Sequence, residues 1–231
     1  MLSPDDHPDP APHPPARCCA RPWFLLVKAL TDRLLAFVAL LLAGLPMLLL
    51  AWLIRRDGHP ALFRQTRAGL HGRPFALLKF RTMRVDADPF GDSPQTADDP
   101  RLTPLGRRLR EWSLDELPQL INVLRGEMSL VGPRPLYLQQ MAEWNDRQRA
   151  RLLVKPGLTG LAQIHGRADL TLEDKLEWDV RYVETISLRT DLGILWRTLR
   201  NVWRRGGIYE TRYSRTQARR SGEPTPPGPQ T

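Results

Sequence analysis

The longest apolar stretch of the chain covers residues 34–54, where all 21 positions are apolar. As a straight helix, this stretch would be about 31 Å long, which is enough to cross the hydrocarbon core of a bilayer. A cleaved signal peptide is a poor alternative, because the run is long, starts late and leads directly into Arg55, Arg56 and Asp57. The pattern therefore predicts a membrane-inserted helix.

The charges and the proline around this stretch bear on how it enters the membrane. Pro46, close to Gly44, removes one helical hydrogen bond and should bend the helix. Basic residues are equally numerous before and after the stretch, so the positive-inside rule favours neither orientation. Such a balance is expected if both ends of the helix stay on the cytoplasmic face. We predict a proline-broken re-entrant helix over residues 23–56, while a kinked spanning helix stays open. The evenly placed basic residues are Arg17, Arg21, Lys28 and Arg33 before the stretch and Arg55, Arg56, Arg64 and Arg67 after it.

Strand and helix patterns follow the apolar stretch. Residues 75–80, FALLKF, are typical of a strand, and Gly69 and Gly72 before it predict the turn of a β-hairpin. Residues 188–205 form an amphipathic helical pattern with leucines and tryptophans on one face and arginines largely off it. Such a helix suits an interfacial membrane position, although a core helix with an arginine-rich outer face has the same pattern. The predicted fold class is α+β: the re-entrant membrane helix, then a small mixed helical domain with a short β-hairpin and interfacial amphipathic helices.

Composition narrows the partners and the domain limits. The 34 Lys and Arg residues against 25 Asp and Glu give a net charge of +9, which indicates an anionic partner such as nucleic acid, a membrane surface or a phosphorylated molecule. The two cysteines are adjacent and the five histidines lack ligand spacing, so neither a disulfide framework nor a structural zinc is indicated. Residues 1–22 and 211–231 are predicted to be disordered, which leaves residues 57–210 as a cytoplasmic domain.

Two acids lie at the start of an apolar helical run in WSLDELPQLINVLR, residues 112–125. Ser113 and Glu116 have the spacing of a capping box, and Pro118 suits the first helical position. In either register Asp115 lies close to a helix N-terminus, where a carboxylate should be ionised and a phosphate would be attracted. The local pattern leaves open whether Asp115 is a cap or a nucleophile.

Several cations and one amide are candidates for binding an anionic ligand. Arg134 lies between Pro133 and Pro135, which restrict the backbone and would hold the guanidinium ready for bidentate phosphate binding. Lys79 and Arg81 alternate with a phenylalanine at the end of the predicted strand, where they are either ligands or solvated strand ends. The loop KPGLTGLAQIHGR, residues 155–167, adds Lys155, Gln163 and Arg167.

Taken in order, KFRTM, SLDELPQLINVLRGEMSLVGPRP and KPGLTGLAQIHGR after a proline-interrupted apolar segment resemble the bacterial sugar transferase family. The resemblance covers roughly residues 23–210, and its middle block is a specific signal. It implies an enzyme that transfers a sugar 1-phosphate from a UDP-sugar to undecaprenyl phosphate and releases UMP. It also implies a catalytic domain on the cytoplasmic face of the bacterial inner membrane, in contact with its lipids, and a role in starting a surface glycan.

The resemblance further implies roles for individual residues. Asp115 matches the family's nucleophilic aspartate, Glu116 matches its neighbour, and Arg110 matches the arginine five positions before this dyad. Arg134 matches the arginine of the family's GPRP block. A Mg²⁺ ion held by Asp115 and Glu116 would help to neutralise the diphosphate. The predicted substrate-binding residues are Lys79, Arg81, Arg110, Arg134, Gln163 and Arg167, and Pro46 is the predicted break in the membrane helix, although Leu45 stands where the family often has a serine.

A non-enzymatic membrane scaffold or a nucleic-acid-binding protein is the alternative, because the net charge and the basic amphipathic helix would serve either one. Neither alternative gives a function to Asp115, Glu116 or the proline-flanked Arg134. Catalysis requires Asp115, Arg110 and Arg134 to converge at one site, whereas a scaffold would spread its arginines over open surfaces.

Overall fold

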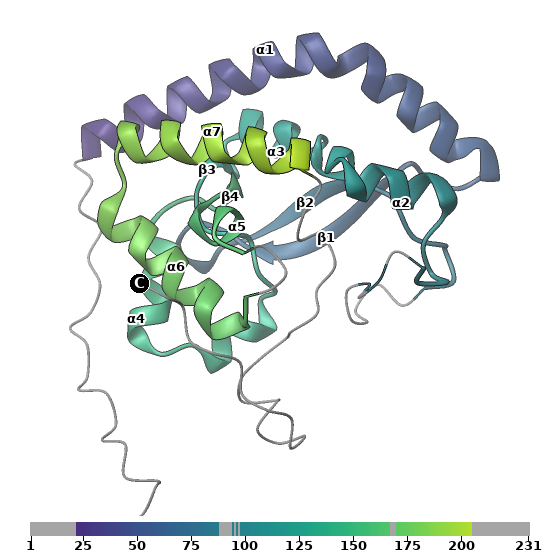
Figure 1. The fold of residues 1–231 in the computed structure, drawn as a ribbon. Coiled ribbons are helices and arrows are strands. Elements are labelled where there is room, and N and C mark those ends of the chain that lie inside the picture. The colour runs from purple at the N-terminus through teal and green to yellow at the C-terminus, as the bar shows by residue number, and fades with distance from the viewer. Residues whose placement is uncertain (1–21, 88–93, 95, 97, 167–169, 205–231) are drawn as a thin grey trace, which may run out of the picture.

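A computed structural model describes residues 22–87, 94, 96, 98–166 and 170–204. The predicted disordered ends, apart from Pro22, and Arg167 lie outside the described residues. Figure 1 shows one long helix arching over a layer of shorter helices, with two small sheets beneath them. The helices are α1 (Pro22–Ile54), α2 (Pro104–Glu111), α3 (Gln119–Arg125), α4 (Asp146–Arg149), α5 (Leu161–Ile164), α6 (Leu172–Thr185) and α7 (Leu188–Arg204), and the strands are β1 (Leu62–Ala68), β2 (Pro74–Phe80), β3 (Ser129–Val131) and β4 (Gly157–Thr159).

The predicted β-hairpin is present. Strands β1 and β2 pair antiparallel from Leu62 opposite Phe80 to Ala68 opposite Pro74. The turn between them uses left-handed backbone at His71 and Gly72, with φ of 55° and 75°. Strands β3 and β4 form a second, parallel pair that the sequence patterns do not reveal, because each is only three residues long.

Helix α1 runs for 33 residues and passes through Pro46 without interruption. The prediction of a broken helix is therefore wrong at the level of the helical backbone, and a continuous curve takes the place of the break (Figure 1). A proline within a helix removes one hydrogen bond and bends the axis while the flanking turns remain helical. Helix α1 is also long and apolar enough to cross a membrane by length and composition.

Helix α1 packs against the domain along its whole length. Phe24 and Leu25 near its start pack with the core around Tyr182. In its middle, Ala36 is fully buried in a cluster that includes Leu120 of α3. The last turns pack on the end of β2 and on α2 through residues that include Ile54. One face of α1 is therefore fixed on the domain from end to end.

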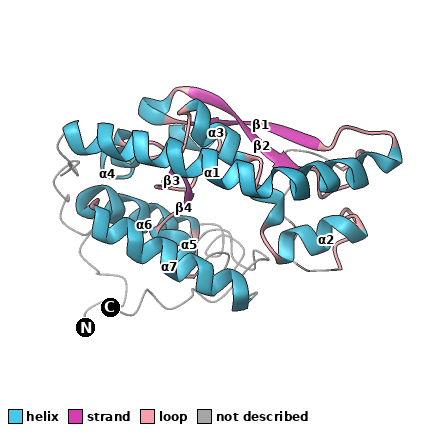
Figure 2. Ribbon diagram, turned by 90° about the horizontal axis from the view of Figure 1, so that it is seen from above, coloured by secondary structure: helices cyan, strands magenta, loops and turns pink. Residues whose placement is uncertain are grey.

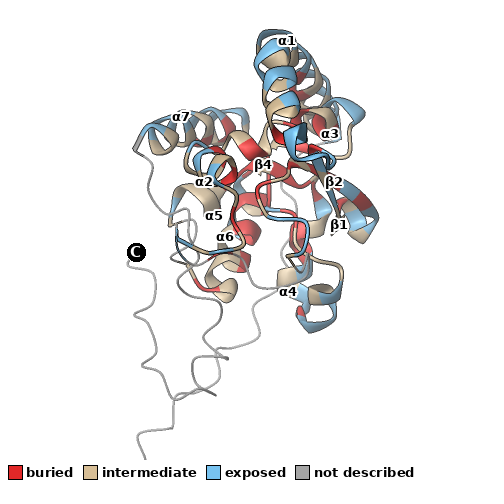
Figure 3. Ribbon diagram, turned by 90° about the vertical axis from the view of Figure 1, so that its right-hand side faces the viewer, coloured by how far each residue is buried: buried red, intermediate tan, exposed pale blue. Residues whose placement is uncertain are grey.

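The opposite face of α1 is apolar and exposed, as the pale-blue outer surface in Figure 3 shows. Leu42 and Leu45 are each 78% exposed, and Trp52 is 55% exposed. Seen from above in Figure 2, α7 lies beside α1. A large exposed apolar surface of this kind indicates contact with a membrane or a partner.

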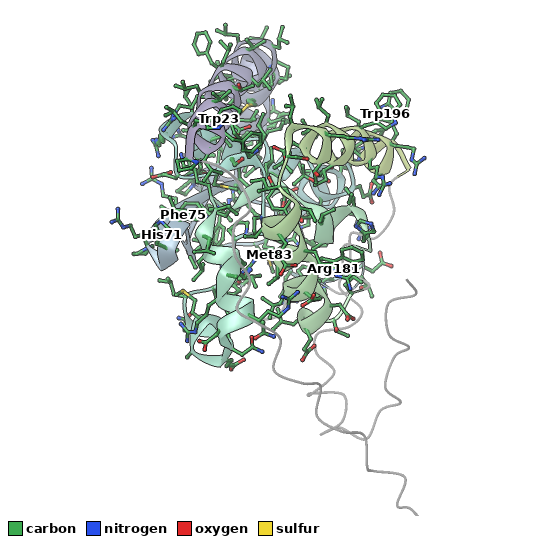
Figure 4. The ribbon with its side chains drawn as sticks, turned by 90° about the vertical axis from the view of Figure 1, so that its left-hand side faces the viewer. Trp23, His71, Phe75, Met83, Arg181 and Trp196 are labelled. Carbon is green, nitrogen blue, oxygen red and sulfur yellow. The ribbon has the colours of Figure 1, made fainter. Side chains whose placement is uncertain are left out.

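Helix α7 exposes its apolar face in the same way. Trp196 and Trp203 are 72% and 81% exposed, while Ile194 on the inner face is buried. In Figure 4, Trp196 points away from the domain, on the side of the molecule where α1 lies. This excludes the alternative of a core helix that turns only arginines outward. The exposed apolar residues of α7 are Leu188, Leu192, Trp196, Leu199 and Trp203.

Candidate active site

The predicted capping box at Ser113 does not form. Ser113 has left-handed backbone, with φ of 55° and ψ of 21°, and its side chain makes no capping hydrogen bond. Residues Leu114–Glu116 form a single 3-10 turn, after which Pro118 leads into α3. The Glu116 carboxylate instead accepts a hydrogen bond from Lys79, so it is turned toward β2. The turn thus places both acids against neighbouring elements rather than on their own helix end.

Asp115 is the buried member of the acid pair, with 7% of the residue exposed. Burial raises the pKa of this carboxyl above its ordinary value, and the positive charges of Lys79, Arg110 and Arg134 oppose that rise. Desolvation therefore outweighs the factors that favour the charged form, and the ionisation of Asp115 expected at a helix end stays a prediction. Among the residues that the structure describes, the Asp115 side chain has neither a hydrogen bond nor an ion pair. Lys79, Arg110 and Arg134 therefore act on the Asp115 carboxylate through their charge and not through a direct bond.

The Glu116 carboxylate lies close to two cations that come from different parts of the chain. The Nζ of Lys79 on β2 lies 2.9 Å from its Oε1, and the Nη2 of Arg134 lies 3.6 Å from the same atom. The Arg134 side chain is 45% exposed, so one side of its guanidinium faces solvent. Lys79 and Arg134 are far apart in the sequence, yet both meet at the dyad. A carboxylate shared by two cations holds those cations in place for another anion.

Arg110 reaches the site from the last turn of α2. Its Nε donates to the Oγ1 of Thr82 at 2.9 Å, just beyond the end of β2. The same segment receives the start of α2, because Thr103 caps the helix through the N–H of Gly106 and donates to the carbonyl of Thr82. A Cβ on Gly106 would collide with that carbonyl. Helix α2 is therefore docked closely enough to fix the position of Arg110.

Not all predicted ligands converge on the dyad. Arg81 bonds the carboxylate of Asp57 at 2.6 Å and the carbonyl oxygens of Pro60 and Ile54 at 2.9 Å, so its described partners lie at the end of α1. Gln163 on α5 has both amide atoms buried without a hydrogen-bond partner among the described residues. A buried amide with no partner is uncommon and indicates a group that a ligand would satisfy.

Sequence reasoning missed Arg67 on β1. Its guanidinium stacks on the ring of Tyr137 at 3.5 Å and donates to Gln65 at 2.6 Å. Burial lowers its pKa to about 10, and the charge of Arg134 acts in the same direction, while Tyr137 and Glu116 oppose it. Arg67 is therefore a further cation within electrostatic range of the dyad. Nothing in its sequence context distinguishes it from the other arginines.

The two acids of the dyad, Asp115 and Glu116, are the residues predicted to hold a Mg²⁺ ion. The described residues contain no cluster of three or more His, Cys, Asp or Glu side chains that could hold a metal ion. Mg²⁺ in phosphate-handling sites is commonly held by one or two carboxylates together with substrate phosphates and water. Asp115 and Glu116 are adjacent hard oxygen donors, so the dyad fits this mode of binding and does not fit an all-protein cage.

These features define a small α+β protein that carries one long apolar helix and, beside it, an acid–cation site suited to phosphate chemistry. The chain belongs to the bacterial sugar transferase family, whose sequence model matches residues 23–205. The predicted family membership is confirmed.

The chain is similar over most of its length to several named sugar transferases. The chain is 44% identical over 190 residues to the uncharacterized sugar transferase EpsL of Bacillus subtilis, covering 82% of this chain and 93% of that protein. It is 38% identical over 198 residues to the undecaprenyl-phosphate galactose phosphotransferase of Salmonella typhimurium, covering 79% of this chain and 42% of that protein. It is 47% identical over 169 residues to the UDP-glucose:undecaprenyl-phosphate glucose-1-phosphate transferase of Caulobacter vibrioides, covering 67% and 61%. The chain thus spans nearly all of EpsL and less than half of the Salmonella protein.

Proposed function

We propose that this protein transfers a sugar 1-phosphate from a UDP-sugar to undecaprenyl phosphate and releases UMP. The family and the names of the Salmonella and Caulobacter relatives support transfer of a sugar phosphate to a lipid carrier. The relatives named exopolysaccharide production protein support a place at the start of surface glycan assembly, such as exopolysaccharide, capsule or O-antigen. The donor sugar is left open, because the uridine and the phosphates are common to all candidate donors.

The observation that carries the mechanism is the buried Asp115 carboxylate, which lacks a direct partner among the described residues and lies within the field of three cations. A structural acid in such a place would be expected to accept a hydrogen bond or join an ion pair. An acid with a raised pKa beside cations is instead typical of a functional group. We assign Asp115 as the nucleophile.

In the first step, an Asp115 oxygen attacks the phosphorus that carries the sugar. The bond from that phosphorus to the bridging oxygen breaks, and UMP leaves with the bridging oxygen and its electron pair. The product is an aspartyl phosphosugar. In the second step, a phosphate oxygen of undecaprenyl phosphate attacks the same phosphorus, and the Asp115 carboxylate leaves. Two displacements through a covalent intermediate replace one direct transfer between two anions.

The cations around the dyad stabilise the charge that moves during these steps. Arg110 and Arg134 would bind the donor diphosphate, and Lys79 would hold Glu116 in place while adding positive charge. Gln163, with its unsatisfied amide, and Arg167 remain proposed donor ligands. Arg81 is better explained by its bonds to the end of α1.

Asp115 and Glu116 would also hold a Mg²⁺ ion against the diphosphate oxygens. When bound, the ion would neutralise negative charge on the donor and the leaving UMP. Glu116 already lies against Lys79 and Arg134, so its carboxylate would be held in place before the ion binds.

We propose that α1 enters only the cytoplasmic leaflet of the inner membrane. A helix that crosses the bilayer has to leave its domain, whereas α1 packs on the domain at its start, middle and end. Its exposed apolar face and the tryptophan-bearing face of α7 would lie in the membrane interface together. This arrangement would present the dyad to a lipid-linked phosphate at the membrane surface. The scaffold alternative is disfavoured, because Arg110 and Arg134 converge on Asp115 instead of spreading over open surfaces.

The decisive experiment for the chemistry omits the lipid acceptor. Purified protein mixed with UDP-sugars and Mg²⁺ should release UMP in a burst of at most about one equivalent per active site, because the covalent step precedes acceptor binding. Mass spectrometry should then find the sugar phosphate on the peptide that contains Asp115. UMP release that strictly requires undecaprenyl phosphate, with no trapped adduct, would support direct transfer instead.

The membrane arrangement is tested by labelling. Single cysteines at positions 25 and 58, in a chain with Cys18 and Cys19 replaced by serine, should both react only from the cytoplasmic side. Labelling of one of these positions from the outside would establish a spanning helix.

A further inference from the structure

The loop that carries Arg134 leaves the short parallel sheet at Gly132. The N–H of Gly132 donates to the carbonyl of Thr159 at 2.8 Å, and the N–H of Gly157 donates to the carbonyl of Pro133 at 2.8 Å. A Cβ on Gly157 would collide with the backbone of Gly132, so the two segments approach more closely than other residues allow. These bonds fix the loop as far as Pro133. They do not fix the peptide plane that follows Arg134.

A second guanidinium holds that peptide plane. Nη2 of Arg151 donates to the carbonyl oxygen of Arg134 and also to Oδ2 of Asp179 on α6, the latter at 2.6 Å. Nε of Arg151 donates to the same Oδ2 at 3.2 Å. The side chains of Arg151 and Asp179 are only 3% and 2% exposed, and the ring of Trp144 lies 4.8 Å from the Arg151 guanidinium. The Arg134 carbonyl is therefore bound by a buried and charge-neutralised group.

The bond to the Arg134 carbonyl completes the restraint of the backbone from which the Arg134 side chain extends. Pro133 and Pro135 hold their own φ angles, and Pro135 restricts Arg134 to extended backbone. The ψ angle of Arg134 sets the direction of its carbonyl. Because the bond from Gly157 to Pro133 holds the preceding peptide, fixing this carbonyl holds the backbone on both sides of the Arg134 Cα and so fixes the direction of the Cα–Cβ bond. A charge-assisted hydrogen bond to the carbonyl selects one value of that angle. The guanidinium of Arg134 then meets Glu116 at 3.6 Å.

We infer that the Arg151–Asp179 pair is a positioning element that orients Arg134 for the donor diphosphate. The inference rests on the proposed function, because it assumes that Arg134 binds the donor. Arg151 and Asp179 themselves are positioning residues and do not touch the substrate.

A purely structural clamp between α6 and the turn that carries Arg151 is the competing explanation. Buried ion pairs contribute little net stability compared with apolar side chains of similar size, so leucine or methionine would clamp the two elements as well. Apolar side chains would not bond the carbonyl of Arg134. Asp179 is also within electrostatic range of the loop: burial raises its pKa, and Arg151, then the backbone N–H of Arg134, oppose that rise. Its Oδ1 is buried without a hydrogen-bond partner among the described residues. The pair therefore lies beside the Arg134 backbone and bonds its carbonyl oxygen.

The test replaces the whole pair in the full-length protein. Arg151→Met combined with Asp179→Leu leaves no unpaired buried charge, so the thermal unfolding temperature should stay near that of the parent protein. In the steady-state assay with undecaprenyl phosphate present, kcat/KM for the UDP-sugar should fall roughly 10- to 100-fold, mainly through KM, because the Arg134 side chain is no longer held in position. Arg151→Lys is the second variant: it keeps the charge opposite Asp179, but one ammonium does not reproduce the planar fork, and a fall of about tenfold is expected.

A double-mutant cycle separates positioning from general loosening. If the pair acts through Arg134, removing it in an Arg134→Ala background should reduce kcat/KM by less than about twofold more, because coupled residues are not additive. Arg147→Met is the matched control. Arg147 bonds Glu177 and Glu184 on the same helix α6, at 2.8 Å each, and has no recorded bond to the Arg134 loop among the described residues. Its variant should keep kcat/KM within about threefold of the parent.

Two outcomes overturn the inference. A folded pair variant or Arg151→Lys variant with parental kcat/KM, while Arg134→Ala is strongly impaired, overturns the positioning role and leaves the proposed function standing. Full multiplication of the two losses in the cycle also overturns it, since the pair would then act independently of Arg134. Absence of UMP release in the parent protein even with undecaprenyl phosphate present is a different result, which overturns the proposed function together with the inference.

Discussion

Two clusters of buried charge lie beneath α1, and they are built differently. In the closed cluster, every carboxylate has a direct partner: Lys28 lies 2.7 Å from Asp191 and 3.4 Å from Asp32. Hydroxyl groups complete it, because Ser129 donates to Asp32 at 2.5 Å and Tyr182 donates to Asp191 at 2.8 Å. In the open cluster at the dyad, the Asp115 carboxylate has cations nearby but no direct partner among the described residues.

The difference separates structural charge from functional charge. Burial is the leading cause of a raised pKa for both Asp115 and Asp191, so desolvation penalises both acids. At Asp191 direct bonds from Lys28 and Tyr182 offset part of the penalty and also tie α1 to α6 and α7. At Asp115 no such bond offsets it, and the unused hydrogen-bonding capacity remains for a ligand. We therefore expect changes in the two clusters to affect different measurements.

The largest effect is expected at Asp115. Asp115→Asn keeps the size of the side chain but removes the nucleophilic charge, so acceptor-free UMP release should fall on the order of 10⁴-fold or more. The covalent adduct should disappear from the mass spectrum, while the thermal unfolding temperature stays at or above that of the parent. Substantial activity in this variant would return Asp115 to a structural role and remove the basis for the comparison.

Lys28 provides the opposite case. Lys28→Met leaves Asp32 and Asp191 facing each other without their shared cation, and breaking a buried pair in this way costs about 3–5 kcal/mol of unfolding free energy. Thermal unfolding in detergent or nanodiscs should show a clear loss of stability. The kcat of the folded fraction should stay within about threefold of the parent, since Lys28 does not touch the dyad. A folded and stable Lys28→Met protein with low kcat would make the closed cluster part of the active site.

The cations of the open cluster should affect the rate more than the stability. Replacement of Arg110 or Arg134 by alanine should lower kcat/KM roughly 100-fold, because each removes a diphosphate contact worth about 2.7 kcal/mol in the transition state. Arg134→Lys should recover only part of the loss, since an ammonium does not bind two oxygens as a planar fork does. Near-parental kinetics in both alanine variants, measured by UMP release, would reject the donor-binding role.

The sequence predicts the parts of this molecule that depend on local pattern. The apolar run gives the long helix, and the strand with its glycine turn gives the hairpin. The motif blocks give the family and select Asp115 and Arg134 as candidates. The face of α1 that packs on the domain is not predictable, because residues 34–54 are apolar all round and only tertiary contact chooses Ala36 for burial. Composition indicates that α1 contacts a membrane, but it does not indicate which face of the helix packs on the domain.

The errors at the site have the same physical cause. Ser113 and Glu116 have capping-box spacing, but Lys79, brought in by the hairpin, takes the Glu116 carboxylate. Lys79 and Arg81 are equivalent in the sequence, and only the path of the chain sends one to the dyad and the other to the end of α1. Among the 34 Lys and Arg residues of the chain, the sequence does not distinguish Arg151, and only its bonds to Asp179 and to the Arg134 carbonyl reveal its role. Partners distant in sequence decide the role of each charge.

The smallest expected effect is on how the unfolding free energy depends on pH, through Asp191 in the closed cluster. An ion pair that more than compensated burial would lower the pKa of this acid. Burial raises the pKa of Asp191 above its ordinary value of 3.8, and Asp32 acts in the same direction, while Lys28 and Tyr182 oppose the rise. Because the folded pKa is above the unfolded one, the unfolded chain loses its proton first as the pH increases. The contribution of Asp191 to stability is therefore fully present below pH 3.8 and is lost as the pH rises through the raised pKa.

Asp191→Asn removes this titration, so the stability difference between the parent protein and the variant should shrink from acidic to neutral pH. Unfolding temperatures of both proteins, measured between about pH 3.5 and pH 7 at fixed ionic strength, provide the test. Asp179→Asn is not a suitable control, because it would leave Arg151 buried without its partner, whereas the exposed acid Asp86 can be replaced by asparagine with little change. A difference that instead grows toward neutral pH would mean that the bonds from Lys28 and Tyr182 outweigh desolvation. The closed cluster would then stabilise the charged form of Asp191, and the contrast with the unpartnered carboxylate of Asp115 would be larger than the burial of the two acids indicates.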